Sequence, residues 1–282
     1  MSLEPDDLVL CAGSLGPATL REKLDAAAAA GFGGVSIFIH ELAQSRAEGF
    51  GEADVRHLAA DLGLGLAELD PLLTWLPEAG APQTSDTGSS MGGFGIDDFL
   101  DVGEALGVRS INAALVGSEP VGPDAMAEGF AALCDRAAER GLLVSLEFVA
   151  FAQLRDLAAA VDVVERAGRA NGGVMFDTIH QLRSGGSHAL LERVAARVNG
   201  IQLNDVAAQP EPDPVAETLH RRLLPGEGDA DTVGQLRALA AGGCRAPIGV
   251  EVFSDVLNAL APAEAARRCI EATRKVLAEA RA

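Results

Sequence analysis

Four short apolar runs in the second half of the chain each end on a side chain that can bind a metal ion. The residues at these ends are Glu147, Asp177, Gln202 and Glu251. A strand buried on both faces loses free energy by ending on an unpaired carboxylate, so these acids are expected to have a role. Three acids and an amide brought together would form an oxygen-rich site for a divalent cation. Without an ion, the pKa of at least one of the acids would have to rise steeply.

The elements that must position these residues follow a regular order. Extended apolar runs alternate with stretches rich in Ala, Leu and Arg, a pattern typical of βαβ units and a parallel sheet. The predicted strands are 8–14, 34–39, 65–69, 110–116, 143–148, 173–177, 200–204 and 248–253. The predicted helices are 18–30, 52–62, 96–106, 123–140, 154–167, 187–196, 231–241 and 262–280. Gly31, Gly63, Gly107 and Gly141 follow four of these helices, as C-caps require.

Eight such units predict an α/β fold, a single-domain (β/α)8 TIM barrel over residues 1–282. A doubly wound open sheet is the less favoured alternative. In a closed barrel the four polar strand ends belong to adjacent strands, so their side chains converge at the carboxyl end. Two long excursions, 72–95 and 206–228, also follow strand ends and are expected to form mobile lids, or else tolerated surface insertions.

Composition excludes several classes of function. The net charge of −19 and the lack of a Lys/Arg cluster argue against nucleic-acid binding. No apolar run approaches the roughly 20 residues that a membrane span needs. The acidic segment 1–7 does not resemble a secretion signal, so a cytoplasmic protein is expected. The four cysteines are scattered and are expected to be reduced thiols, and both lysines lie in predicted helices, away from any strand end where a Schiff base would form.

Five segments of the sequence resemble those of a known protein family. They are VSLEF at 144–148, MFDTIH at 175–180, IQLND at 201–205, RLLPGEGD at 222–229 and GVEVF at 249–253. Together they resemble the xylose-isomerase-like TIM-barrel superfamily of sugar phosphate isomerases and epimerases. The resemblance implies that Glu147, Asp177, Gln202 and Glu251 bind one divalent ion, Mn, Mg, Co or Zn. A Gln in the third position is similar to the inosose isomerase, hydroxypyruvate isomerase and dehydroshikimate dehydratase branches, and less so to the ketose 3-epimerases.

The resemblance also implies roles for two residues outside the ligand set. His180, three residues after Asp177, would contact substrate or assist proton transfer, and Arg222 would bind a substrate oxygen or carboxylate, bidentately if the geometry allows. Further candidates at the carboxyl end of the barrel are Asn112, His220, His40, Glu68 and Asp70, each of which could equally serve a local structural purpose. Trp75 could close over a substrate or pack its loop down.

A metal beside two glutamates suits proton transfer next to a carbonyl. With Glu147, Glu251 and His180 as catalytic residues, we expect an isomerase or epimerase that acts on a sugar, sugar phosphate or polyol ketone through an enediolate. The alternative within enzymes is a metal-dependent dehydratase of dehydroshikimate or inosose type. From another class, the chain would be a non-catalytic sugar-binding barrel. A homo-oligomer is a further expectation, because related barrels often form dimers or tetramers.

Overall fold

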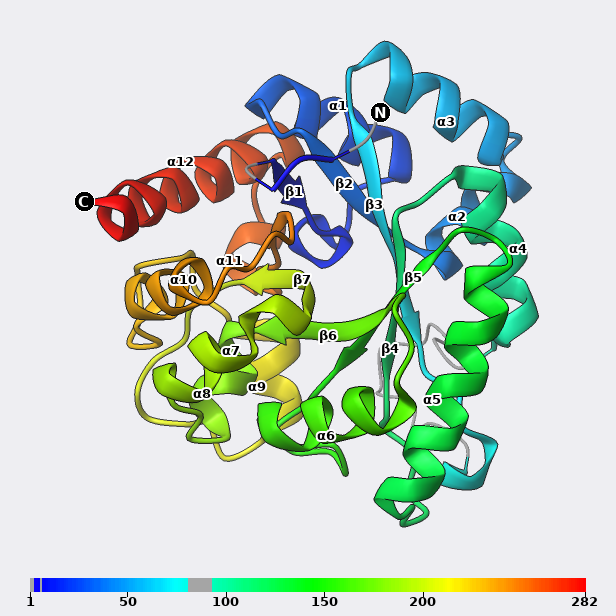
Figure 1. Ribbon diagram of the computed structural model, residues 1–282. Helices are drawn as coiled ribbons and strands as arrows, with labels where there is room; N and C mark the ends of the chain where they lie inside the picture. Colours follow the sequence, from blue (N-terminus) through cyan, green and yellow to red (C-terminus); the bar gives the residue numbers. More distant parts are fainter. Residues whose placement is uncertain (1–2, 6, 81–92) are drawn as a thin grey trace.

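A computed structural model describes residues 3–5, 7–80 and 93–282 and shows a closed barrel of eight parallel strands in chain order. Helices surround the barrel (Figure 1). The predicted TIM barrel is therefore confirmed. The strands are β1 (Leu8–Leu10), β2 (Gly34–Phe38), β3 (Gly65–Leu72), β4 (Ser110–Ala114), β5 (Leu143–Glu147), β6 (Gly172–Asp177), β7 (Val198–Leu203) and β8 (Ile248–Val250).

All eight predicted helices are present, with ends shifted by a few residues. They are α1 (Leu20–Ala30), α3 (Glu52–Asp61), α4 (Ile96–Leu106), α5 (Pro123–Ala138), α6 (Leu157–Ala167), α8 (His188–Val194), α10 (Thr232–Ala241) and α12 (Pro262–Arg281). The four glycines expected at helix ends all adopt positive φ angles, which only glycine does without strain. The long closing helix α12 packs against α1 and α10, so the last helix of the barrel lies beside the first (Figure 1).

Four short helices in the segments that follow strands were not predicted. They are α2 (Ile39–Ala47), α7 (Thr178–Arg183), α9 (Pro214–His220) and α11 (Asp255–Asn258). Each is too short to show a clear 3.6-residue period in the sequence. All four lie at the carboxyl ends of strands, so they shape the face where barrel enzymes bind their substrates.

The closure of the barrel between β1 and β8 departs from the predicted strand ends. The chain leaves β1 at Leu10 and forms a 3₁₀ turn, Ala12–Leu15, where the sequence predicted a strand continuing to Ser14. The Ser14 hydroxyl replaces backbone hydrogen bonds that a longer β1 would make with β8. It donates to Val250 O at 2.8 Å and accepts from Val252 N at 2.9 Å. As a result β8 ends at Val250, and Glu251 begins the loop that follows it.

The structure describes the excursion 206–228 in full and the excursion 72–95 in part. In 206–228, helix α9 is fastened by the buried carboxylate of Glu217, which accepts hydrogen bonds from Arg183 Nη2 at 2.7 Å and Nε at 2.8 Å. In 72–95, the segment 81–92 lies outside the described residues, so the expected lid there is not tested. Within the parts of the chain that the structure describes, no helix is both long and apolar enough to cross a membrane.

Candidate active site

A cavity of about 530 Å³ opens at the carboxyl end of the barrel. Its buried end carries the polar side chains that end the strands, and its walls are largely apolar. Among the polar residues that line it are Asp70, Glu147, His180, Gln202, Arg222 and Glu251. The apolar wall includes Phe38, Leu73, Val149, Phe151, Leu219 and Phe253. Three of the four strand ends that the sequence singled out, Glu147, Gln202 and Glu251, therefore line a space large enough for a small molecule.

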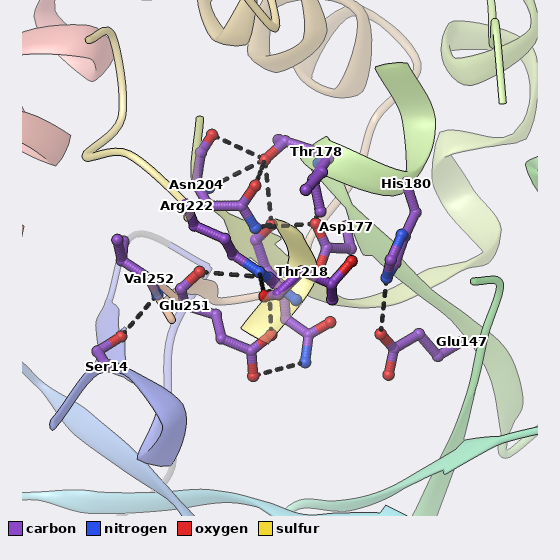
Figure 2. A network of polar contacts seen from close by, with 12 residues as sticks. Ser14, Glu147, Asp177, Thr178, His180, Asn204, Thr218, Arg222, Glu251 and Val252 are labelled. Carbon is purple, nitrogen blue, oxygen red and sulfur yellow. Dashed lines mark hydrogen bonds and ion pairs between the residues drawn. The ribbon is translucent and has the colours of Figure 1, made fainter. Parts of the chain in front are cut away.

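Three side chains at the base of the cavity form a group that suits a divalent metal ion. One ligand atom each from Glu147, Asp177 and His180 lies within 4.8 Å of the others. Helix α7 starts immediately after β6, and this turn aims His180 back at the strand ends, with Nε2 3.9 Å from Glu147 Oε1 (Figure 2). Asp177 is oriented in turn, because its Oδ1 accepts from Ile179 N at 2.9 Å and from Asn204 Nδ2 at 2.8 Å.

Unpartnered oxygens around this group strengthen the fit to a metal ion. Gln202 Oε1, Asp70 Oδ2 and Asn112 Oδ1 are buried and have no hydrogen-bond partner among the described residues. A buried polar atom without a partner costs free energy unless a ligand, water or ion satisfies it. Carboxylate, amide and imidazole donors are those that Mg, Mn, Co and Zn ions accept, so these residues fit one divalent ion.

Glu251 stands apart from this group, which differs from the predicted ligand set. Arg222 Nη1 donates to Glu251 Oε2 at 3.1 Å, and Gln202 Nε2 donates to Glu251 Oε1 at 3.1 Å. The same Arg222 nitrogen lies 2.8 Å from Asp177 Oδ2, so the guanidinium sits between two acids (Figure 2). Thus His180, expected only to contact substrate or move a proton, joins Glu147 and Asp177, while Arg222 supplies charge to Glu251.

Arg222 reaches this position because its backbone and side chain are both held. An isolated bridge pairs Asp205 with Leu223, and Arg222 N donates to Phe253 O at 3.0 Å. Its Nε donates to Thr218 O in α9 at 2.8 Å, and its guanidinium lies over the Phe253 ring at 4.9 Å. Burial of an arginine requires such a complete set of partners. The excursion 206–228 therefore serves to place a cation at the base of the cavity.

The raised pKa values of the buried acids agree with a site that binds a cation. Burial, followed by the charges of Asp70 and Asp177, raises the pKa of Glu147 to about 8. Burial also raises the pKa of Glu251 well above its usual range and that of Asp70 to about 6, where the Asn112 hydrogen bond opposes it. The steep rise in pKa expected of clustered acids is thus present. Burial lowers the pKa of His180 to about 4, so its imidazole is neutral at neutral pH and able to bind a metal.

Three residues predicted to bind substrate do not line the cavity. Asn112 is fully buried, and its Nδ2 donates to Asp70 Oδ1 at 2.8 Å and to Glu147 Oε2 at 2.6 Å, so it orients acids instead. The Trp75 indole is buried against Phe130 and donates to Ala114 O at 3.0 Å, which packs the loop down. These placements depend on side-chain direction, which the sequence does not reveal.

His220 is the third of these residues. It lies at the end of α9, and its half-exposed ring turns away from the cavity to Asp255 Oδ1, 3.0 Å from Nδ1. Of the weaker candidates, Asp70 lines the cavity, whereas His40 and Glu68 do not. Asp70 was recognisable by the same signal as the other acids, an apolar run ending on a carboxylate.

The sequence reasoning missed several residues that line the cavity. Phe151 lies edge-on to His180, with ring centroids 6.0 Å apart, and Phe38 stacks with Phe253 at 6.2 Å. Arg155 lines the cavity from the loop between β5 and α6. Single aromatic and basic residues in loops have no periodic signal, so only the fold could place them.

The chain belongs to the xylose isomerase-like TIM barrel family, whose model matches residues 24–276. It is 32% identical over 244 residues to a 3-dehydroshikimate dehydratase from Pseudomonas aeruginosa, and 27% identical over 243 residues to one from Pseudomonas putida. Each alignment covers 86% of this chain, which spans only 37% of the length of either relative.

Solved structures share the fold. The IolI protein with a bound zinc atom superposes with a TM-score of 0.84 at 18% identity, over 97% of this chain and 98% of that one. A fusion of a xylose isomerase-like TIM barrel with 4-hydroxyphenylpyruvate dioxygenase gives 0.83 at 24%, over 98% of this chain and 43% of that one. D-allulose 3-epimerase from Methylomonas sp., in complex with D-allulose, gives 0.71 at 18%, over 97% and 98%. At these identities the likeness shows the fold alone.

Proposed function

We propose that this chain catalyses a metal-dependent dehydration of 3-dehydroshikimate or a closely similar cyclic hydroxyketone. The observation that carries the proposal is the group formed by Glu147, Asp177 and His180 at the base of a cavity. It is supported by the 32% identity to a 3-dehydroshikimate dehydratase. This is the alternative that the sequence analysis ranked second, and the relatives favour it over isomerisation.

In this proposal the metal ion is held by Glu147, Asp177 and His180, with Gln202 Oε1 as a further oxygen donor. Once bound, the ion would polarise the substrate ketone and so acidify the neighbouring C–H bond. Mn, Mg, Co and Zn are all compatible with this mixture of oxygen and nitrogen donors. The charge of the ion would also favour the ionised forms of acids whose pKa values burial has raised.

Glu251 is the residue placed to move the proton. Hydrogen bonds from Arg222 Nη1 and Gln202 Nε2 orient its carboxylate at the cavity wall, outside the metal group. It would take the proton from the carbon beside the ketone and deliver it to the hydroxyl on the next carbon, which leaves as water. Passing that proton on with the leaving water restores the carboxylate and leaves a ring dienone. Transfer of one proton from the ring CH₂ group to the ketone oxygen then gives the aromatic acid protocatechuate. The apolar wall keeps bulk water away from this exchange.

His180 has a different part in the reaction. Its lowered pKa, about 4, keeps the ring neutral, so it is suited to bind the metal or accept a substrate hydrogen bond and not to store a proton. Phe151 lies against its edge and narrows the space around it. Loss of the imidazole is therefore expected to weaken metal binding as well as turnover.

The test is to incubate the purified chain with 3-dehydroshikimate and each of the four metal ions, and to follow protocatechuate by its ultraviolet absorbance. We expect turnover that EDTA abolishes, that E251Q lowers by about 10²-fold or more, and that E139Q, an exposed control at the C-cap of α5, leaves unchanged. Absence of product with every ion, or full activity in E251Q, would contradict the proposal.

Isomerisation or epimerisation of a sugar or polyol ketone is the second candidate. The observation in its favour is that Glu147 and Glu251 both line the cavity, so one acid could remove a proton and the other return it. The phenylalanines of the wall favour a ring with few hydroxyls over an open sugar. A panel of inososes, ketoses and hydroxypyruvate separates the two functions. Binding of these compounds by calorimetry without turnover of any would instead indicate a sugar-binding barrel.

A further inference from the structure

Arg155 is a cavity-lining cation that no carboxylate of the described residues neutralises. Its exposed side chain lines the active-site cavity, and within residues 3–5, 7–80 and 93–282 it makes no hydrogen bond or ion pair. Among the described residues that line the cavity, Arg222 is the other arginine, and Asp177 and Glu251 hold it at 2.8 and 3.1 Å. Arg155 therefore carries the positive charge that remains available to a ligand.

The excess of acids in the cavity indicates that this guanidinium attracts an anionic ligand. Asp70, Glu147 and Glu251 line the buried end, and the whole chain has a net charge of −19. An anionic substrate that entered such a cavity would be repelled unless a cation met it. A guanidinium binds a carboxylate through two parallel hydrogen bonds, which fixes the orientation of the ligand as well as attracting it.

The backbone that carries Arg155 is anchored, while its side chain is free to turn. In the loop after β5, Val149 N donates to Leu154 O at 2.8 Å. Gln153 joins this loop to the one after β4, because its Nε2 donates to Gly117 O at 2.9 Å and its Oε1 accepts from Val121 N at 2.9 Å. Asp156, the next residue along, caps α6 by accepting from Ala159 N at 2.9 Å. The position of the Arg155 backbone is thus set before any ligand binds.

We propose that Arg155 binds a carboxylate of the substrate and so selects ring hydroxyketones that carry one. This proposal rests on the dehydratase function proposed above and adds to it how the substrate is oriented. The reacting ketone lies at the buried end beside Glu147 and Glu251, and the carboxylate points to the exposed end at Arg155. Phe151 and Val149, on the same loop, supply an apolar surface for the ring between the two ends.

Steady-state kinetics with 3-dehydroshikimate give the first test. R155Q is expected to raise KM by about 10- to 100-fold, the range for loss of a charged hydrogen-bonded pair, and to leave kcat within about threefold. R155K, which keeps the charge, is expected to recover part of the loss. The control is R245Q, an exposed arginine in the loop between α10 and β8, at the opposite end of the barrel. Unchanged KM in R155Q would overturn the proposal.

Calorimetry separates this proposal from the proposed reaction. The probes are protocatechuate and catechol, which share two adjacent hydroxyls and differ by the carboxylate, each titrated into the Mn-loaded protein. The wild type is expected to prefer protocatechuate by about tenfold or more, and R155Q is expected to lose the preference. If 3-dehydroshikimate is not turned over, the reaction fails while a preference that depends on Arg155 still supports carboxylate binding. A wild type with no preference, or an R155Q that keeps it, overturns the role of Arg155.

Discussion

The guanidinium of Arg222 donates a 2.8 Å hydrogen bond to Asp177 Oδ2, and both side chains are buried. The two residues are 45 positions apart in the chain, and they meet because β6 ends at Asp177 while the bridge after β7 returns Arg222 to the same place. Two acids without this cation would repel each other in a medium of low polarity. The pair therefore makes the cluster of acids compatible with a folded barrel.

Removal of this cation is expected to destabilise the protein strongly. R222Q leaves Asp177 and Glu251 buried without their partner, and breaking a buried ion pair in this way costs about 3–5 kcal/mol. Urea unfolding of the metal-free protein measures the loss. The adjacent R221Q is a matched control, because Arg221 is exposed and pairs with exposed Asp255, so it should unfold near the wild-type midpoint. Equal stability of the two variants would contradict the assigned role.

Metal binding is expected to stabilise the wild type and not E147Q. An ion present at 100 times its dissociation constant adds about 2.7 kcal/mol to the free energy of unfolding. E147Q removes one of the three clustered donors, so the rise in melting temperature on adding MnCl₂ should be mostly lost, whereas E139Q should retain it. A metal-dependent rise of the same size in E147Q would show that the ion binds elsewhere.

Asn112 is expected to affect the rate of the reaction more than substrate binding. Its Nδ2 orients Asp70 and Glu147, and it does not line the cavity. N112A should lower kcat by about 10- to 100-fold, since small errors in the position of reacting groups have large effects on rate. KM for 3-dehydroshikimate should change much less. A raised KM with normal kcat would instead support the prediction that Asn112 binds substrate.

The sequence predicts the barrel well because its signals are local and repeated. Apolar runs and helical stretches recur eight times, glycines follow four of the helices, and a unit that carries an acid places it at its strand end without help from the others. The short helices α2, α7, α9 and α11 escape this reasoning, since one or two turns carry no periodic signal.

The contacts within the site are harder to predict, because they depend on where side chains point. Trp75 and His220 both lie in segments that follow strand ends, which made them candidates for the site. In the structure the Trp75 indole donates to Ala114 O, and the His220 ring lies against the carboxylate of Asp255. His180 joins Glu147 and Asp177 because α7 begins immediately after Asp177, and the sequence analysis predicted no helix there. Arg155 belongs to no motif, and the meeting of two loops through Gln153 places it.

The last prediction concerns Glu68, a buried acid of β3 that lies outside the metal group. Burial, with a further contribution from the charge of Asp70, raises its pKa to about 8, while Arg109 opposes the rise. In the unfolded chain a glutamate has a pKa of about 4.3. Between these two values the native state holds a proton that the unfolded state has released.

Stability must therefore fall as pH rises through this window, because the native state binds more protons than the unfolded state. Below the unfolded pKa both states are protonated and Glu68 has no effect; above the folded pKa its penalty is complete, of the order of a few kcal/mol. E68Q keeps the shape without the acid. We expect it to match the wild type near pH 4 and to exceed its stability at pH 8.5, by urea unfolding of the metal-free protein. The exposed control E227Q should show the same dependence of stability on pH as the wild type. If the stabilities of the wild type and E68Q change with pH in parallel, Glu68 ionises in the folded protein without a cost in stability.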